Sequence, residues 1–174
     1  ESGASFALPE GRERTERLDS VFEVIYLIFN EGYTATRGSD LMRPSLCEEA
    51  LRLGRILAEL MPGEPEVHGL IALMELQASR LRARVGPDGE PILLLDQDRS
   101  RWDRLLIKRG LAALARAASV GTLGPYGLQA AIAACHATAR TPEDTDWTRI
   151  AALYDALVQI TESPIVRLNR SVAL

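Results

Sequence analysis

Apolar residues recur at the spacing of an α-helix in segment after segment of this chain. The first segment, residues 12–30, ends in the nearly continuous apolar run VFEVIYLIF. Apolar positions three and four residues apart share one face of a helix, so this period favours helices over strands. The chain is also rich in Ala, Leu, Arg and Glu, which lose little side-chain freedom in a helix. The sequence therefore predicts an all-α fold.

Pro, Gly and polar turn residues divide the chain into seven expected helices. These occupy about residues 12–30, 45–61, 65–84, 101–121, 125–139, 146–160 and 165–174. The expected N-caps are Ser45 for the second helix, Asp98 or Ser100 for the fourth, and Asp144 or Thr145 for the sixth. Residues 92–95 follow a strong turn signal and are expected to form a short extended segment.

Short breaks between these helices favour antiparallel hairpins, and successive hairpins stack into a solenoid. Trp147, Ile150, Ala151 and Tyr154 have the spacing of the conserved positions of a tetratricopeptide (TPR) repeat. The predicted architecture is a TPR-like solenoid over residues 12–174. Residues 1–11 are expected to be disordered or to form a linker from a longer chain.

Charge and composition exclude several classes of function. A net charge of −4 argues against a surface that neutralises nucleic-acid phosphates. The two cysteines, Cys47 and Cys135, lie in apolar segments and are expected to be buried, reduced thiols. The chain contains no apolar run of membrane-spanning length and no signal-peptide pattern, which favours a cytoplasmic protein.

The densest polar cluster is the polar string, residues 96–103, with the sequence DQDRSRWD. Asp96 and Asp98 could hold a divalent cation, but no phosphate loop or parallel-sheet pattern accompanies them. The favoured interpretation is that Asp98 caps a helix while Arg99 and Arg101 pair with nearby acids. A contact with a partner or ligand is the third alternative.

No catalytic motif is present. His68 and His136 are far apart in sequence, and the adjacent Cys135 and His136 would point about 100° apart on a helix. No nucleophile elbow, metalloprotease motif or dinucleotide fingerprint occurs. We therefore expect neither catalysis nor a bound cofactor or metal.

Several polar side chains interrupt otherwise apolar helices. They are Asn30 with Glu31, Gln129, and Asn169 with Arg170. A buried polar group must be hydrogen-bonded, so these residues are expected to specify helix packing. If several converge on one concave face, they could instead receive a peptide or a small ligand.

Five motifs, in order, resemble the C-terminal extension of a group of bacterial extracytoplasmic-function sigma factors. The motifs are residues 24–33 (VIYLIFNEGY), 69–74 (GLIALM), 96–103 (DQDRSRWD), 124–134 (GPYGLQAAIAA) and the stretch from Thr145 to Arg170. The extension is a TPR-like module that follows two DNA-binding sigma domains. This chain departs from the family pattern at four positions, Lys108, Arg109, Cys135 and Ser171. The basic pair at 108–109 affects any partner contact that depends on charge.

The resemblance implies a regulatory domain that tunes transcription initiation. Its implied partners are its own sigma domains and core RNA polymerase, with DNA reached only through those sigma domains. The polar string supplies the candidate contact residues Asp96, Asp98, Arg99, Trp102 and Asp103. A concave surface lined by Trp102, Tyr126, Gln129 and Tyr154 is expected to receive the partner. The alternative is a ligand-sensing domain, in which Asn30, Asp98 and Arg170 would enclose a small molecule.

Overall fold

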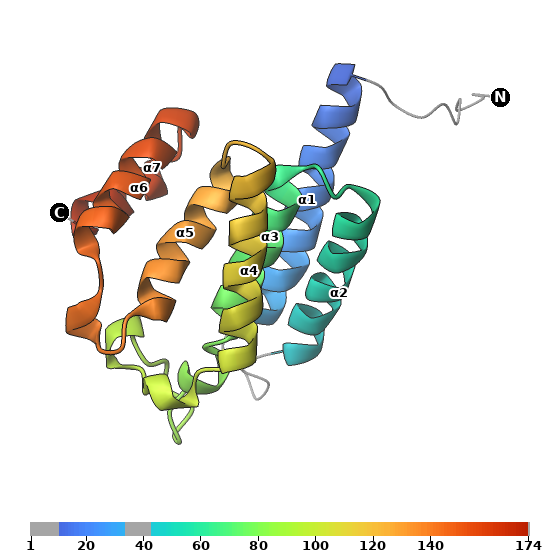
Figure 1. Ribbon diagram of the computed structural model, residues 1–174. Coiled ribbons are helices and arrows are strands. Elements are labelled where there is room, and N and C mark those ends of the chain that lie inside the picture. Colours follow the sequence, from blue (N-terminus) through green and yellow to red (C-terminus); the bar gives the residue numbers. More distant parts are fainter. Residues whose placement is uncertain (1–10, 34–42, 174) are drawn as a thin grey trace.

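The computed structural model of this chain describes residues 11–33 and 43–173. The described part contains seven α-helices and no strand (Figure 1), which confirms the all-α prediction. The helices are α1 (Gly11–Tyr33), α2 (Pro44–Leu60), α3 (Pro65–Ala78), α4 (Arg104–Val120), α5 (Pro125–Thr138), α6 (Trp147–Ile160) and α7 (Pro164–Ala173). Four 3₁₀ helices join them: η1 (Leu81–Ala83), η2 (Leu94–Asp96), η3 (Arg99–Arg101) and η4 (Pro142–Asp144).

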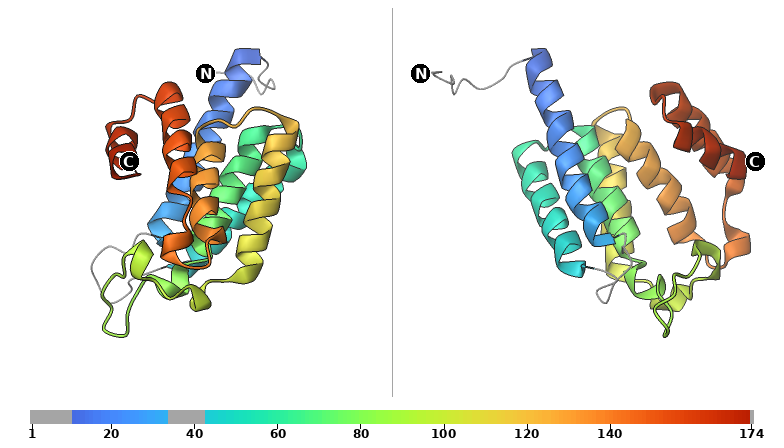
Figure 2. Two further views of the ribbon diagram at one scale, coloured as in Figure 1. Left: turned by 60° about the vertical axis from the view of Figure 1, so that its left-hand side comes forward. Right: turned by 180° about the vertical axis from the view of Figure 1, so that it is seen from behind.

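Consecutive helices pack as hairpins, α1 with α2, α3 with α4, and α5 with α6, and α7 packs on α6. Helix α3 lies at the centre, where it also contacts α1, α2 and α5 (Figures 1 and 2). Residues 67–76 of α3 are all buried. A helix surrounded on all sides must be apolar on all sides, which explains why α3 has almost no polar face.

The core is divided among three groups of side chains. Phe22 and Phe29 of α1 pack with Leu70 of α3 in the first group. Trp102 lies in the second, between α3, α4 and α5. Ile150 belongs to the third, which joins α5 to α6 and α7. The first two groups share partly buried residues, among them Tyr26 and Tyr126, and the second group includes the loop between α3 and α4.

Two glycines allow α3 to approach its neighbours closely. A Cβ atom on Gly69 would lie 2.7 Å from the backbone nitrogen of Gly127 on α5. A Cβ atom on Gly110 of α4 would lie 2.7 Å from Cγ of Leu76. Any side chain larger than hydrogen at these positions would push the helices apart.

Several predicted boundaries are wrong. Helix α2 begins at Pro44 rather than after Ser45, because the fixed φ of proline suits the first helical position. Helix α3 ends at Ala78, six residues earlier than predicted, and η1 follows it. The expected extended segment 92–95 is partly replaced by η2. The predicted linker largely lies outside the described residues, and Gly11 is already helical.

The predicted caps of the fourth and sixth helices are also wrong. Asp103 caps α4, accepting backbone N–H bonds from Leu105 (2.9 Å) and Leu106 (3.0 Å). Asp146 caps α6 through the backbone N–H of Arg149. Several Asp, Ser or Thr residues precede these helices, and any of them satisfies the capping pattern. Packing of the preceding loop selects which one is used.

No helix in residues 11–33 or 43–173 combines the length and apolar character needed to cross a membrane.

Candidate functional site

The polar string packs against the C-terminal end of α5 and stabilises it. The Arg99 guanidinium donates from Nη1 to the backbone oxygens of His136 (2.6 Å) and Ala139 (3.0 Å). Its central carbon lies 4.7 Å from the centroid of the Trp102 ring. Both side chains are buried. A cation that pairs with the free carbonyls at a helix C-terminus stabilises that terminus.

The three acids of the string have different surroundings. Hydrogen bonds from the Ser100 side chain and from the Ser100 backbone N–H (2.9 Å) lower the pKa of the Asp98 carboxyl. Asp103 caps α4, as described above. Asp96 is exposed. The described residues include no group of three or more His, Cys, Asp or Glu side chains placed to hold a metal ion.

Tyr126 joins α5 to α1 through its ring. The ring packs edge-on against Phe22 and Tyr26, with centroid separations of 5.8 Å and 5.6 Å. Burial and nearby acids raise the pKa of the Tyr126 hydroxyl to about 12. Tyr126 therefore acts as a packing residue in this structure.

A cavity of about 470 Å³ lies between α3, α5, α6 and α7, and we call it the α3–α7 cavity. Its polar lining side chains are Gln77, Arg80, Gln129, His136, Tyr154, Thr161, Ser163 and Asn169. Its apolar wall comes from Leu73, Leu94, Ile132, Ala133, Leu157, Ile165 and Val166. A volume of roughly 300–1,000 Å³ with mixed apolar and polar walls is typical of ligand sites.

The electrostatic character of the cavity is set by Arg80, the one charged residue among the described residues that line it. Arg80 is half-buried, and its Nη2 lies 3.4 Å from the Tyr33 hydroxyl oxygen. Burial lowers the pKa of His136 to about 4, and the positive charges of Arg80 and Arg99 act in the same direction. His136 is therefore neutral near pH 7, and this end of the cavity is positive.

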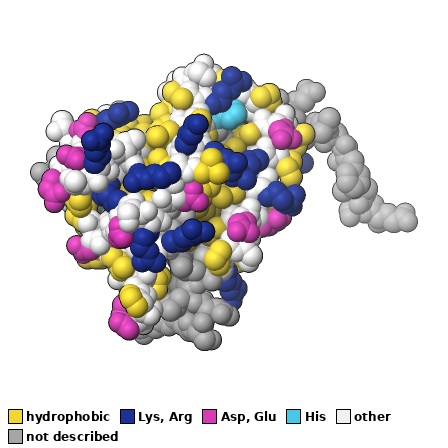
Figure 3. Space-filling view, turned by 60° about the horizontal axis from the view of Figure 1, so that its bottom comes forward, with side chains coloured by type: hydrophobic (Ala, Val, Ile, Leu, Met, Phe, Trp, Pro, Cys, Tyr) yellow, Lys and Arg dark blue, Asp and Glu magenta, His cyan; other side chains and the backbone are white. Residues whose placement is uncertain are grey.

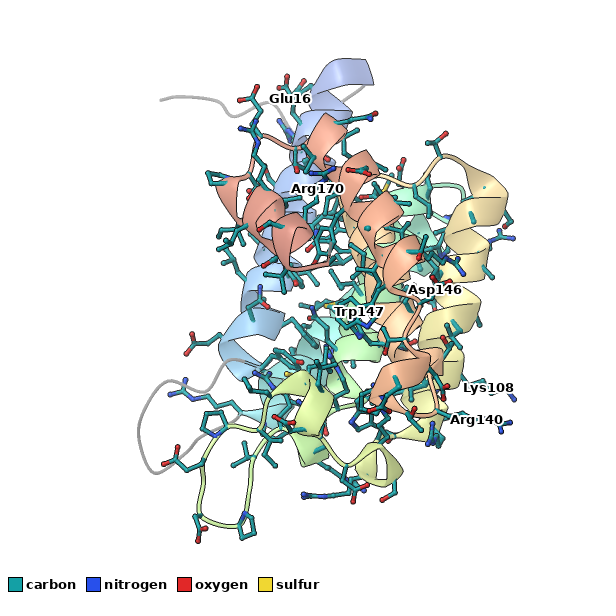
Figure 4. All side chains as sticks on the ribbon, turned by 90° about the vertical axis from the view of Figure 1, so that its left-hand side faces the viewer. Glu16, Lys108, Arg140, Asp146, Trp147 and Arg170 are labelled. Atoms are coloured by element: carbon teal, nitrogen blue, oxygen red, sulfur yellow. The ribbon has the colours of Figure 1, made fainter. Side chains whose placement is uncertain are left out.

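Two lining side chains hold buried polar atoms that have no partner among the described residues. They are Oε1 of Gln77 and Nδ1 of His136. Gln77 uses its amide nitrogen on the Tyr26 hydroxyl, 3.3 Å away. The His136 ring packs edge-on against Trp147, whose place at the start of α6 is labelled in Figure 4. A buried polar atom without a partner lowers stability, so such atoms mark sites that water or a ligand can complete.

The structure brings together some of the predicted site residues and separates others. Gln129, Tyr154 and Asn169 line the α3–α7 cavity, whereas Trp102 and Tyr126 do not. Arg170 instead bonds to Asp155 of α6, and Figure 4 marks its position on α7.

The residues proposed for an enclosed ligand pocket do not converge. Asn30 interacts with the Tyr26 hydroxyl, while Asp98 caps η3 and Arg170 pairs with α6. Glu31 is exposed and lies 3.6 Å from Arg43. None of these residues lines the α3–α7 cavity.

Sequence reasoning missed Gln77, Arg80 and His136 as site residues. A signal was present, because Leu73, Gln77 and Arg80 are separated by four and then three residues. Gln129, Ala133 and His136 repeat that spacing on the neighbouring helix. Residues at this spacing within a helix share one face, and the packing of α3 on α5 places the faces with Gln77 and Gln129 side by side. Arg80 lies in the turn after α3, at the same end of the cavity as His136.

The cysteines are free and buried, as predicted. Burial raises the pKa of Cys47 to about 11 and also raises that of Cys135. Reactive cysteines have lowered pKa values, so neither thiol has the surroundings of an activated nucleophile.

The end of the molecule that carries the segment between α3 and α4 has a mixed charged surface. Figure 3 views this end, where Lys and Arg side chains lie across the face with Asp and Glu side chains among and around them. Arg82, Arg101, Arg104 and Lys108 are exposed in this segment and in the start of α4. The basic pair at 108–109 is exposed at the start of α4.

Comparison with known proteins matches residues 17–118 to the Family of unknown function (DUF6596). An uncharacterized protein of Rhizobium meliloti (strain 1021) is 49% identical over 173 residues, which is 99% of this chain. The chain spans only 41% of the length of that relative. No solved structure matches the chain.

Proposed function

This chain belongs to the DUF6596 family, and from that premise we propose that it is a regulatory protein-interaction domain of an extracytoplasmic-function sigma factor. In this proposal the domain is cytoplasmic and binds the sigma domains of its own parent chain. Binding shifts the equilibrium between active and inactive sigma states, and core RNA polymerase is a further partner. The domain itself performs no catalysis.

The α3–α7 cavity is the observation that carries this proposal. It combines an apolar wall with polar side chains from α3, α5, α6 and α7, and two of its buried polar atoms have no partner within residues 11–33 and 43–173. A surface that combines apolar area with unsatisfied polar groups is suited to receive another segment of protein.

The order of helix contacts supports a TPR-like solenoid as the form of the domain. Each hairpin packs on the next through α3 and α5, which lie side by side. Trp147, Ile150, Ala151 and Tyr154 have the repeat spacing on α6.

The length of the relative supports a parent chain with further domains. The matched 173 residues are 41% of it, so roughly 250 residues lie outside the match, enough for one or two ordinary domains. Two sigma domains would fit in that length.

Calorimetric titration of this chain against the remainder of its parent protein tests the proposal. We expect micromolar binding that is weakened in a double variant, Gln129→Ala with Asn169→Ala, because both amides line the cavity. Gln159→Ala is the matched control, since Gln159 is exposed on α6 and does not line the cavity. Absence of binding by the intact chain would overturn the proposal.

Arg99 and Trp102 are unsuitable positions for this test. Both are buried, and Arg99 holds the end of α5, so their replacement would disturb folding as well as any contact. Circular dichroism and a urea midpoint must show that each cavity variant remains folded.

A small-ligand-sensing domain is the second candidate function. The size of the α3–α7 cavity and its unpartnered Gln77 and His136 atoms favour it. The residues that carry it differ from the Asn30, Asp98 and Arg170 set expected from the sequence.

A further inference from the structure

We infer that the α3–α7 cavity recognises a carboxylate attached to an apolar body, with the carboxylate bound at Arg80. This inference rests on the proposed function, in which the cavity is the contact site. The occupant is a peptide segment with a carboxylate or a small organic acid of the same kind.

Arg80 carries a positive charge that no carboxylate of the described residues neutralises. Arg55 of α2, by contrast, is paired with the buried Glu75 of α3 at 2.7 Å. A half-buried guanidinium that lines a cavity without a counter-ion is a site for an anion from outside the chain.

A second guanidinium adds to the positive potential at this end. Arg99 lies close enough to His136 for its charge, like that of Arg80, to disfavour the protonated imidazole. Nε and Nη2 of Arg99 are buried and have no partner in the described part of the chain. The charges of Glu143 and Asp144 in η4 act on Arg99, but neither carboxylate is among the ion pairs of the described residues. An anion at Arg80 would offset the repulsion between these groups, and partial burial strengthens that attraction.

The apolar wall of the cavity determines which group the occupant must carry besides its carboxylate. Leu73, Ile132, Leu157, Ile165 and Val166 present aliphatic surface to the cavity. Burying a leucine-sized group against such a surface contributes about 1.5–3 kcal/mol. An inorganic anion could not use this surface, so the anion must carry an apolar body.

The amide groups add a third requirement. Oε1 of Gln77 is a buried acceptor without a donor, and the Gln129 amide nitrogen is used only on the Pro125 backbone oxygen, 3.1 Å away. Both amide side chains line the cavity, and an amide oxygen suits an N–H group on the occupant. A carboxylate, an aliphatic side chain and an amide N–H occur together at the C-terminal residue of a peptide and in an N-acyl amino acid.

The test uses the 174-residue chain and three probes. N-acetyl-L-leucine carries all three groups, and N-acetyl-L-leucinamide lacks only the charge. The third probe is N-acetyl-Ala-Ala-Leu-Leu with a free C-terminus. Binding is followed by the ¹⁵N–¹H resonances of the Gln77, Gln129 and Asn169 side-chain amides.

We expect N-acetyl-L-leucine to bind at least about tenfold more tightly than its amide, because only the acid can pair with Arg80. Arg80→Gln should remove that difference, whereas Arg82→Gln should keep it, since Arg82 is exposed and does not line the cavity. Ala133→Leu, on the facing helix, should weaken both probes by filling the cavity. A urea midpoint for each variant separates lost binding from lost folding.

The two possible sources are distinguished by the tetrapeptide. Binding about tenfold tighter than that of N-acetyl-L-leucine supports a peptide occupant, and equal binding supports a small acid. Saturation with either acid should also raise the pKa of His136, because the bound anion offsets the charges of Arg80 and Arg99.

Three results would overturn the inference. They are no binding of either acid at about 10 mM, equal binding of acid and amide, or loss of binding in Arg82→Gln to the same degree as in Arg80→Gln. The probes require no sigma domain. If the acid probes do not bind but the sigma domains do, only the carboxylate inference is rejected. If the acid probes bind but the sigma domains do not, only the sigma-domain proposal is rejected.

Discussion

Glu66 on α3 accepts a hydrogen bond of 2.8 Å from the backbone N–H of Tyr126 in the first turn of α5. The same carboxylate accepts bonds of 3.0 Å from the backbone N–H groups of Gly124 and Gly127. The first N–H groups of a helix have no partner within it, and the positive end of the helix dipole favours an anion there. This contact fixes α5 against α3, the two helices that place Gln129 and Gln77 in the cavity.

Glu66→Ala should lower the free energy of unfolding by about 1–3 kcal/mol, because partly buried N–H groups lose their acceptor. Glu66→Gln should restore part of the loss, since one amide oxygen can still accept. Urea unfolding followed by circular dichroism measures both. Glu59→Ala is the control, because Glu59 is exposed on α2. Equal stability of Glu66→Ala and Glu59→Ala would show that the carboxylate does not hold α5.

Gly69→Ala should destabilise the chain by about 1–3 kcal/mol through overpacking. The added methyl group would lie 2.7 Å from the backbone nitrogen of Gly127, where no flexible side chain can move away. Gly63→Ala should stay within about 0.5 kcal/mol of wild type, since a Cβ atom there meets nothing within 4 Å. Thermal and urea unfolding of both variants tests the contrast. An unchanged Gly69→Ala would mean that α3 and α5 are not held at this separation.

Helix content was predictable because it depends on local periodicity, which the run at residues 21–29 of α1 shows clearly. Cap positions were not predictable, because Asp98, Ser100 and Asp103 all satisfy the same N-cap preference. The structure uses Asp103 for α4 because the buried pair Arg99 and Trp102 places residues 98–102 in a separate turn. That selection depends on the distant C-terminus of α5, which no local pattern contains.

The site was predictable only in part for a similar reason. Gln129 stood out as a polar residue in an apolar helix, and it does line the cavity. Arg80 looked like an ordinary polar residue near a helix end. Its significance comes from His136 and Arg99, residues from other parts of the chain that meet it only after folding.

The acids of the polar string should differ sharply in their effect on stability. Asp103→Ala should reduce the free energy of unfolding by about 1 kcal/mol, with a range of 0.5–2, because α4 loses its N-cap. Asp96→Ala should change it by less than about 0.5 kcal/mol, because Asp96 is exposed. The urea midpoints of the two variants measure this difference in stability. If Asp96→Ala were the more damaging change, Asp96 would have a structural partner that this fold does not explain.

His136 should make stability depend on pH in a specific window. Its pKa is about 4 in the folded chain, against an ordinary value of 6.5, because burial and the charges of Arg80 and Arg99 disfavour the protonated ring. As the pH falls, the unfolded state therefore takes up this proton first. The stabilisation is complete above about pH 6.5 and is lost progressively down to about pH 4. At roughly 1.4 kcal/mol per pKa unit, the loss is at most about 3.5 kcal/mol.

Urea unfolding of wild type and His136→Gln at a series of pH values between 7.5 and 4.5 isolates this effect. Glutamine cannot take up the proton, so its variant should lack the part of the pH dependence that comes from His136. Carboxylates such as Glu143 titrate in both proteins, and their effect cancels in the difference. Loss of the ring contact with Trp147 lowers stability equally at every pH, so only the slope is diagnostic. The wild-type advantage should shrink as the pH falls, and an advantage that stays constant would show that His136 is not held in its neutral form.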